Sequence, residues 1–246
     1  MKSVTASVAE TLTQDLALRI MRGELQPGMS IPGENELAVQ YNVSRTSVRN
    51  ALQVLGAKGM LTIQAKRRST VAPREQWSFL DADVLSWLEE IGIDDALIEQ
   101  LMITRLIFEP NAAAMAAINA SGRDLADLEE AWEIMSQGQQ QDSADLFKQG
   151  DLAFHTAILK AGHNPFLFSV GNALSAAMLF SFKRTLEPDV TLTLEAVDAH
   201  RELMECIRLK QPEQARQQMR SILLSAAKKH LGDPLPDRLN HFLTAN

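Results

Sequence analysis

Cysteine is nearly absent from the sequence, and so is any long uninterrupted apolar run. The single cysteine, Cys206, excludes an internal disulfide framework and is typical of a protein in a reducing compartment. No early segment combines a basic start, an apolar run and a small-residue cleavage site, so no secretory signal is predicted. No stretch reaches the roughly 18 apolar residues of a membrane span. We therefore expect a soluble, cytoplasmic protein with no membrane partner.

Positive charge is also in short supply, since 24 Lys and Arg residues against 31 Asp and Glu residues leave a net charge of −7. Spread evenly, this charge would argue against binding to a polyanion. Residues 1–75, however, hold ten basic and six acidic side chains, whereas the rest of the chain holds fourteen and twenty-five. We therefore expect that only the N-terminal part binds nucleic acid.

The first third of the chain predicts a small DNA-binding fold. Residues 8–22 place an apolar side chain at every fourth position, which indicates a helix with one buried face. A second helix is predicted after Pro32, and a third after Ser44, which is a favourable N-cap residue. The segments 61–64 and 69–72 are typical of two strands joined by a basic turn. Three helices followed by a hairpin indicate a winged helix-turn-helix.

The first turn of the third helix carries side chains suited to the major groove of DNA. An arginine can bridge the O6 and N7 atoms of guanine, and small hydroxyl groups can reach phosphates or base edges. Solvated arginines on a surface helix are the alternative, but the helix before and the basic hairpin after favour DNA binding. We predict DNA contacts by Ser44, Arg45, Thr46, Arg49, Lys66, Arg67 and Arg68.

Residues 23–72 resemble the GntR family of bacterial transcription regulators. The resemblance rests on GELQPG at 23–28, PGENELA at 32–38 and VSRTSVRNAL at 43–52. It implies that the third helix lies in the major groove and that the wing tip reaches the minor groove. Two positions depart from the usual pattern: Asn35 stands where many relatives carry a basic residue, and the wing tip at 65–68 lacks glycine.

From Asp83 onward the pattern is helical, without strand signals. The sequence predicts helices near 83–91, 94–119, 122–138, 142–162, 164–186, 190–209 and 211–231. The expected fold class is mainly α, with an N-terminal winged helix-turn-helix and a C-terminal all-α bundle. The expected parts are a DNA-binding domain at 1–74, a linker at 75–82, a helical domain at 83–231 and a tail at 232–246, either a short helix or a loose end.

Two sets of polar residues interrupt the apolar pattern of the helical domain. Arg105 and Glu109 are four residues apart and share a helix face, as an exposed ion pair or, given the alanines that follow, as a buried one. Asp151 and His155 share a second face, and His200 lies on a later amphipathic helix. Together these three can bind a borderline divalent metal, although each histidine alone is also interpretable as a hydrogen-bonded core residue.

Residues 83–231 resemble the FCD domain, the helical ligand-binding domain of the FadR-type subgroup of the GntR family. The resemblance rests on the polar residues just named and on Asn164-Pro165 at a helix start. Metal-binding members hold a divalent ion with one Asp and three His, and the ion helps to capture a carboxylate effector. The position of the fourth ligand falls at Ile222, which cannot bind a metal. The resemblance thus implies three ligands for Zn, Mn or Ni: Asp151, His155 and His200.

The segment 77–87, WSFLDADVLSW, is similar to that of the sugar-acid repressors in this subgroup, such as those of galactonate operons. The similarity implies a hexonate or related sugar acid as effector, with Arg105 binding its carboxylate and Asn172 near its hydroxyl groups. We therefore predict a repressor that binds a palindromic operator as a homodimer and leaves it when the acid binds.

Three alternatives stay open at this point. The effector is another small carboxylic acid, or the divalent metal is itself the signal, or the polar cluster belongs to a metal-dependent enzyme. Release of DNA by metal alone would identify a metal sensor, and turnover of sugar acids with added metal would identify an enzyme. The DNA-binding domain favours a regulator, so we predict that the protein is not an enzyme and has no catalytic residues.

Overall fold

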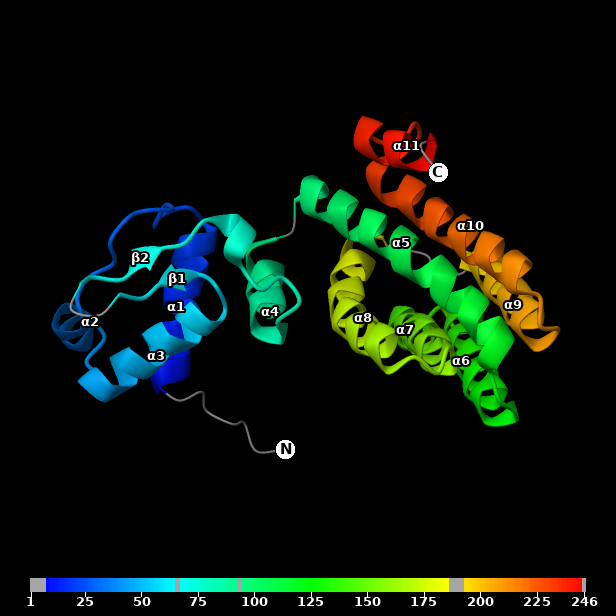
Figure 1. Cartoon of the computed structure of the whole chain (residues 1–246), viewed down its shortest axis with the longest axis horizontal. Coiled ribbons are helices and arrows are strands. Elements are labelled where there is room, and N and C mark those ends of the chain that lie inside the picture. The colour runs from blue at the N-terminus through cyan, green and yellow to red at the C-terminus, as the bar shows by residue number, and fades with distance from the viewer. Residues whose placement is uncertain (1–7, 65–66, 93, 186–192, 245–246) are drawn as a thin grey trace. The chain divides into compact units, whose positions relative to one another are not determined.

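The computed structural model describes residues 8–64, 67–92, 94–185 and 193–244. The chain divides into two compact units, Met1–Gly92 and Ile93–Asn246 (Figure 1). Helices dominate both units, and a two-stranded sheet lies in the first. The expected mainly α class, with an N-terminal winged helix-turn-helix and a helical C-terminal bundle, is confirmed.

The N-terminal unit consists of helices and a small hairpin in the predicted order. Its first elements are α1 (Val8–Met21), α2 (Glu34–Gln40), α3 (Arg45–Ala57), β1 (Leu61–Thr62) and β2 (Thr70–Val71). β1 and β2 pair antiparallel with Leu61 opposite Val71, and Ser30 forms an isolated bridge to Thr70. The paired segments are shorter than expected, because residues 62–64 towards the tip are exposed and no burial stabilises further pairing there.

The apolar stripe of the first helix forms the core of this unit. Leu12 and Leu16 on α1, and Val48 and Leu55 on α3, are each at most 1% exposed. The two helices pack against each other along these residues. Because the inner face of α3 is used for this core, its outer face is free to carry polar side chains.

Beyond the hairpin, a short 3-10 turn (Arg74–Gln76) leads to α4 (Ala82–Ile91), which belongs to the N-terminal unit. Asp81 caps α4, and Lys58 at the end of α3 lies 2.6 Å from Asp81 and 2.7 Å from Asp83. α4 packs against α1 through a buried apolar face made of Val84, Leu85, Trp87 and Leu88. The unit boundary therefore lies at Gly92, ten residues after the expected end of the linker at 82.

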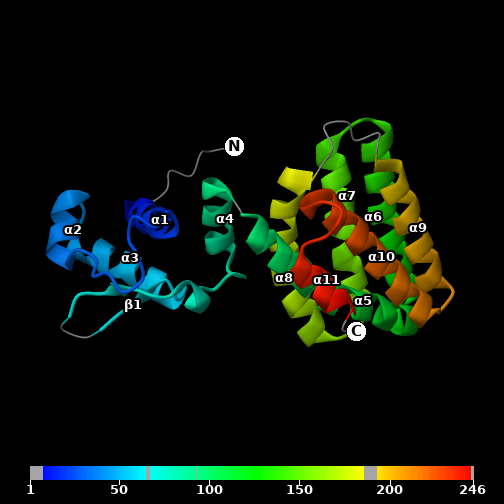
Figure 2. The ribbon, with the colours of Figure 1, turned by 90° about the horizontal axis from the view of Figure 1, so that it is seen from above.

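The C-terminal unit is a helical bundle, and its helices up to residue 231 match the predicted ranges within a few residues. They are α5 (Asp95–Asn119), α6 (Gly122–Gln140), α7 (Ala144–Ala161), α8 (Pro165–Thr185), α9 (Leu194–Arg208), α10 (Pro212–Leu231) and α11 (Asp237–Thr244). The predicted end of one helix at residue 186 and the predicted start of the next at residue 190 lie outside the described residues. α9 packs against both α6 and α10, and Figure 2 shows it at one edge of the unit.

The C-terminal tail contains a helix, which decides between the two expected forms of 232–246. Leu235 and Leu239 are buried, and α11 packs on α5. Arg220 of α10 donates from Nη2 to the carbonyl oxygen of Leu243 at 3.3 Å. The described part of the tail is thus an integral layer of the bundle.

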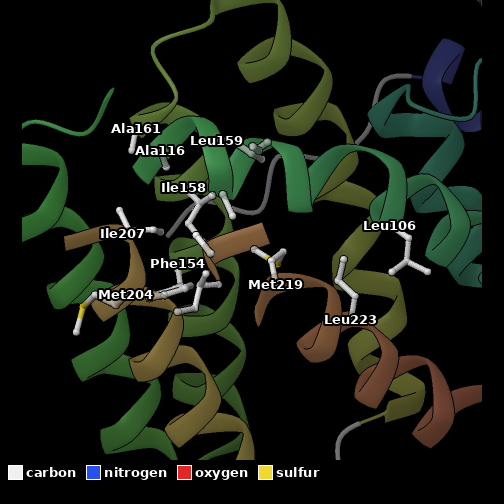
Figure 3. Packing of buried hydrophobic residues seen from close by; sticks show 14 of the residues in the cluster. Leu106, Ala116, Phe154, Ile158, Leu159, Ala161, Met204, Ile207, Met219 and Leu223 are labelled. Carbon is white, nitrogen blue, oxygen red and sulfur yellow. The ribbon is translucent and has the colours of Figure 1, made fainter. Parts of the chain in front are cut away.

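α5 occupies the centre of the bundle, where it contacts α7, α8, α9 and α10. Its small residues permit this close packing, since Ala112, Ala113, Ala116 and Ala117 are fully buried. Phe154 belongs to the same main apolar cluster (Figure 3). By length and mean hydropathy α5 is also apolar enough to cross a membrane, but 56% of the relevant window is buried inside the unit. Such burial is typical of the core helix of a globular bundle.

Candidate functional site

The side chains predicted to contact DNA are exposed on α3 and the wing. Ser44 caps α3, because its hydroxyl oxygen accepts the backbone N–H three residues later at 3.0 Å. Arg45 and Thr46 follow in the first helical turn, and both are exposed. Arg67 is exposed as well, whereas Lys66 lies outside the described residues. Within the described part of the chain, Arg45 forms no ion pair, so its guanidinium is available to a polyanion.

Two of the predicted DNA-contacting arginines are paired with acidic residues of α2. Arg49 donates through Nε and Nη2 to the two carboxylate oxygens of Glu34, at 3.2 and 2.8 Å. Arg68 in the wing donates through Nη2 to Glu36 at 2.6 Å. Sequence reasoning missed both pairs, because the partners lie 15 and 32 residues apart and no periodic signal connects them.

A network of charged side chains is buried inside the C-terminal unit. Arg105 Nε lies 2.6 Å from Glu109 Oε1, and Arg105 Nη2 lies 3.3 Å from Glu109 Oε2. Their side chains are 5% and 4% exposed, so this is the buried form of the predicted ion pair. Glu109 Oε2 also lies 2.7 Å from Nδ1 of His155 on α7, although the ring N–H is poorly aligned with it. Glu109 therefore connects Arg105 to His155.

The three predicted metal ligands converge from α7 and α9. His200 Nε2 lies 3.2 Å from Asp151 Oδ1 and 3.4 Å from His155 Nε2. His155 Nε2 lies 3.9 Å from Asp151 Oδ2. One donor atom from each residue lies within 4.8 Å of the other two, and all three residues are buried. The spacing of Asp151 and His155 on one helix face, inferred from the sequence, thus places both beside His200.

The donor set of this cluster fits a divalent cation. His200 Nδ1 lies 2.7 Å from the carbonyl oxygen of Ala196, which favours a proton on Nδ1 and a lone pair on Nε2. The carboxylate of Glu109 favours the same tautomer in His155. Two Nε2 lone pairs and an Asp151 carboxylate then face one another, an arrangement that a shared cation satisfies. Residues Asp151, His155 and His200 would hold such an ion.

The position implied for a fourth metal ligand does not contribute a donor. Ile222 is a partly buried apolar residue of α10 that packs against the main core cluster. Among the described residues, the groups that could hold an ion in this cluster come from the three residues already named. Any further ligand would therefore come from solvent or from a bound small molecule.

Interactions with neighbouring side chains keep the buried carboxylates ionised. Burial alone would raise the pKa of Glu109, but Arg105 and His155 outweigh burial and lower that pKa to about 2. Burial also disfavours the ionised form of Asp151, yet His155 and His200 lower its pKa below the ordinary value. Both side chains are therefore anionic at neutral pH, as a cation site requires.

The two predicted effector-binding residues lie in different surroundings. Arg105 is buried and paired with Glu109. Asn172 on α8 is exposed, so the structure does not place it in the buried cluster. Sequence reasoning also missed a pocket of about 560 Å³ between α5 and α10, lined in part by Arg216 and Arg220. Arg216 and Arg220 are four residues apart and share a helix face. This spacing is the feature of the sequence that could have indicated the pocket.

Comparisons with known proteins agree with the division into two units. The model of the gntR family of bacterial regulatory proteins matches residues 8–71, and the FCD domain model matches residues 100–225. The galactonate operon transcriptional repressor of Escherichia coli K12 is 31% identical over 226 residues, which cover 92% of this chain and 98% of that protein. The uncharacterized HTH-type transcriptional regulator YieP of the same strain is 31% identical over 202 residues, covering 82% and 86%.

A solved structure supports the fold. The structure of Lar, described as controlling the expression of the Listeria monocytogenes agr system, superimposes with a TM-score of 0.64 at 19% identity. The superposition covers 93% of this chain and 98% of Lar. Both domain models and the 31% identity to a repressor along nearly the whole chain lead to one conclusion: the protein is a DNA-binding transcription regulator of the GntR family with a C-terminal FCD domain.

Proposed function

We propose that the protein is a cytoplasmic repressor of a sugar-acid catabolic operon, and that a sugar acid releases it from its operator by binding the FCD domain. The observation that carries this proposal is the buried cluster of Asp151, His155 and His200, connected through Glu109 to Arg105. Ionisable groups are rarely buried unless they are paired, and clusters of such groups with perturbed pKa values are concentrated at functional sites. The likeness to a galactonate operon repressor supports a sugar acid, such as a hexonate, as that ligand.

In the DNA-binding domain, the proposed contacts come from α3 and the wing. Arg45 is the candidate for a bidentate contact with guanine, and Ser44 and Thr46 are candidates for phosphate contacts. Arg67 and Arg68 would contact the operator DNA that lies against the wing. One recognition helix reads only a short half-site, so we propose that a homodimer binds a palindromic operator.

In the FCD domain, the cluster would bind both a cation and the effector. A divalent ion held by Asp151, His155 and His200 would supply positive charge that attracts the carboxylate of the acid. Arg105 would assist only through the N–H groups that Glu109 leaves free, because their ion pair already neutralises much of its charge. A contact by Asn172 would require the effector to extend to the surface of α8, because that side chain is exposed.

A thermal-shift screen of the purified protein against sugar acids, with and without chelator, tests the effector and the cation together. A ligand at about 100 times its Kd adds about 2.7 kcal/mol to the free energy of unfolding, which is readily detected. We expect one hexonate to raise the Tm and chelator to abolish the shift. His200→Ala should abolish it as well, whereas His163→Ala, an exposed histidine outside the cluster, should not.

Other outcomes of the screen distinguish the alternatives. A Tm shift that survives chelator would show that the acid binds without a cation, and Arg105 would then be the main group that binds its carboxylate. A shift with metal alone, accompanied by loss of operator binding, would make the metal itself the signal, which the three-residue donor set allows. No shift with any sugar acid would contradict the proposed effector class.

A further inference from the structure

Two acidic residues in the first turn of α2 each bind one arginine of the DNA-facing surface. Glu34 forms a two-point pair with Arg49 on the recognition helix, and Glu36 binds Arg68 on the wing. Both pairs connect elements that meet only in the folded domain. α2 is thus tied to α3 on one side and to the wing on the other.

The pair of Glu34 and Arg49 leaves one end of the guanidinium free. Glu34 accepts hydrogen bonds from Nε and Nη2 of Arg49, whereas Nη1 forms no hydrogen bond with any described residue. The Arg49 side chain is still 61% exposed, so DNA can reach it. Arg49 is therefore oriented to approach DNA through its Nη1 end. Glu34 neutralises part of its charge before DNA binds.

Glu36 is fixed from two directions. One carboxylate oxygen accepts the backbone N–H of Gly33 at 3.0 Å and closes the start of α2, while the other accepts Nη2 of Arg68 at 2.6 Å. A glutamine at this position can still accept the Gly33 N–H through its amide oxygen. Glu36→Gln therefore removes the charge from the pair with Arg68 and keeps the helix cap.

We propose that Glu34 and Glu36 are specificity-determining positioning residues, which withhold Arg49 and Arg68 from sequence-independent contacts with DNA phosphates. The inference rests on the proposed role of these arginines at the DNA surface. Free arginines contact any phosphate and raise affinity for all DNA alike. An arginine held by a carboxylate exchanges that partner for DNA only where the operator offers a matching group. The two acids thus lower non-specific affinity more than operator affinity.

The test measures how salt affects binding of the full-length protein to a random-sequence duplex of about 30 base pairs. Each released arginine that contacts a phosphate should steepen the slope of log affinity against log salt by about 0.9. Between about 50 and 200 mM salt, this corresponds to a further loss of affinity of about 3.5-fold. We expect this change for Glu34→Gln and for Glu36→Gln.

Two controls separate positioning from a general change in charge. Glu24→Gln makes the same change in net charge but removes the acidic partner of Arg19 on α1, which is not a predicted DNA contact, and should leave the slope unchanged. Glu34→Gln in an Arg49→Ala background should also leave the slope unchanged, because no arginine is released. For an operator selected from a random pool by the wild-type protein, the ratio of specific to non-specific affinity should fall in Glu34→Gln and Glu36→Gln.

The outcomes distinguish a failure of this inference from a failure of the proposed DNA contact on which it rests. If Arg49→Ala weakens operator binding but Glu34→Gln keeps the wild-type slope and ratio, the positioning role is wrong and the DNA contact stands. Equal slopes for Glu24→Gln and Glu34→Gln would also contradict it, because net charge alone would explain the change. If Arg49→Ala leaves operator affinity unchanged, the DNA contact fails and the inference fails with it.

Discussion

Glu109 contacts Arg105 on its own helix and His155 on a neighbouring one, and all three side chains are almost completely buried. On a solvent-exposed helix face, an ion pair at this spacing would contribute only a few tenths of a kcal/mol to stability. Inside the bundle, removal of one partner leaves the other charge without compensation, which costs far more. The contribution of a charged residue to the free energy of unfolding therefore depends more on whether it is buried than on which residue type it is.

Glu109→Gln should lower the free energy of unfolding of the C-terminal unit by about 3–5 kcal/mol, because it leaves the buried Arg105 without its anion. The measurement is urea unfolding followed by circular dichroism. Glu213→Gln removes the anion from an exposed i,i+3 pair with Arg216 and should change stability by less than about 0.5 kcal/mol. Equal effects of the two substitutions would contradict the burial of the Arg105–Glu109 pair.

Asp124 should contribute to the acid sensitivity of the bundle. Hydrogen bonds from Ser121, with a further contribution from His163, lower its pKa to about 2 against the opposing effect of burial. Because the folded-state pKa lies below the ordinary value of 3.8, this stabilisation is present above that value and disappears as the pH falls towards 2. Asp124→Asn should lack this contribution, about 1 kcal/mol after allowance for solvent screening.

The pH dependence of unfolding by urea tests this assignment. The difference in stability between wild type and Asp124→Asn should be largest at about pH 5 and should shrink towards about pH 2.5. A difference that stays constant over this range would show that Asp124 acts through the shape of its cap alone.

At the scale of elements, α6 and α7 approach so closely that glycine is required at their contact. A Cβ atom on Gly150 would lie 2.2 Å from the backbone nitrogen of Met135, and one on Gly138 would lie 2.3 Å from that of Phe147. Backbone atoms of a packed helix cannot move aside as a flexible side chain can. The spacing of these two helices matters for function, because α7 carries Asp151 and His155.

Gly150→Ala should destabilise the bundle by about 1–3 kcal/mol or more, because the added methyl group forces α6 and α7 apart. Gly122→Ala at the start of α6 is the control, since a Cβ there meets nothing within 4 Å and its backbone has no positive φ. It should be neutral or slightly stabilising, in line with the higher helix propensity of alanine. Unfolding midpoints in urea compare the two, and equal midpoints would contradict the close contact.

At the scale of the whole molecule, the proposed function couples a ligand in one unit to DNA binding by the other. Such coupling has a free energy that acts equally in both directions. The predicted DNA contacts lie in the N-terminal unit, whereas the buried cluster of Asp151, His155 and His200 lies in the C-terminal unit. Under the proposed function, the effector would therefore alter operator affinity by shifting an equilibrium between states of the protein and not through direct contact with DNA.

The effector should weaken operator binding by a factor within about 5 to 150, and operator DNA should weaken effector binding by the same factor. Calorimetric titration of the effector with and without operator measures the second factor, and fluorescence anisotropy of labelled operator measures the first. Arg45→Ala should lose operator binding, keep its affinity for the effector, and show no response of that affinity to operator DNA. Unequal factors for the wild type would contradict a single coupled equilibrium.

The sequence by itself determined most of the local structure of this protein. The start of the recognition helix at Ser44 follows from its N-cap residue, and the ranges of the helices up to residue 231 follow from the spacing of apolar residues. Both signals act over a few residues. The pairing of Asp151 with His155 on one face also follows from local geometry. Such signals survive in any fold, because they depend on the backbone of one helix alone.

Only the tertiary structure decided what these elements contact. It placed α4 on α1, made the tail a packed helix, buried the ion pair of Arg105 and Glu109, and set Glu34 against Arg49. Each of these depends on residues distant in the chain, or on whether a helix face meets solvent or another helix. Periodicity reports which residues share a face, but the free energy of burying that face depends on the packing of the whole bundle.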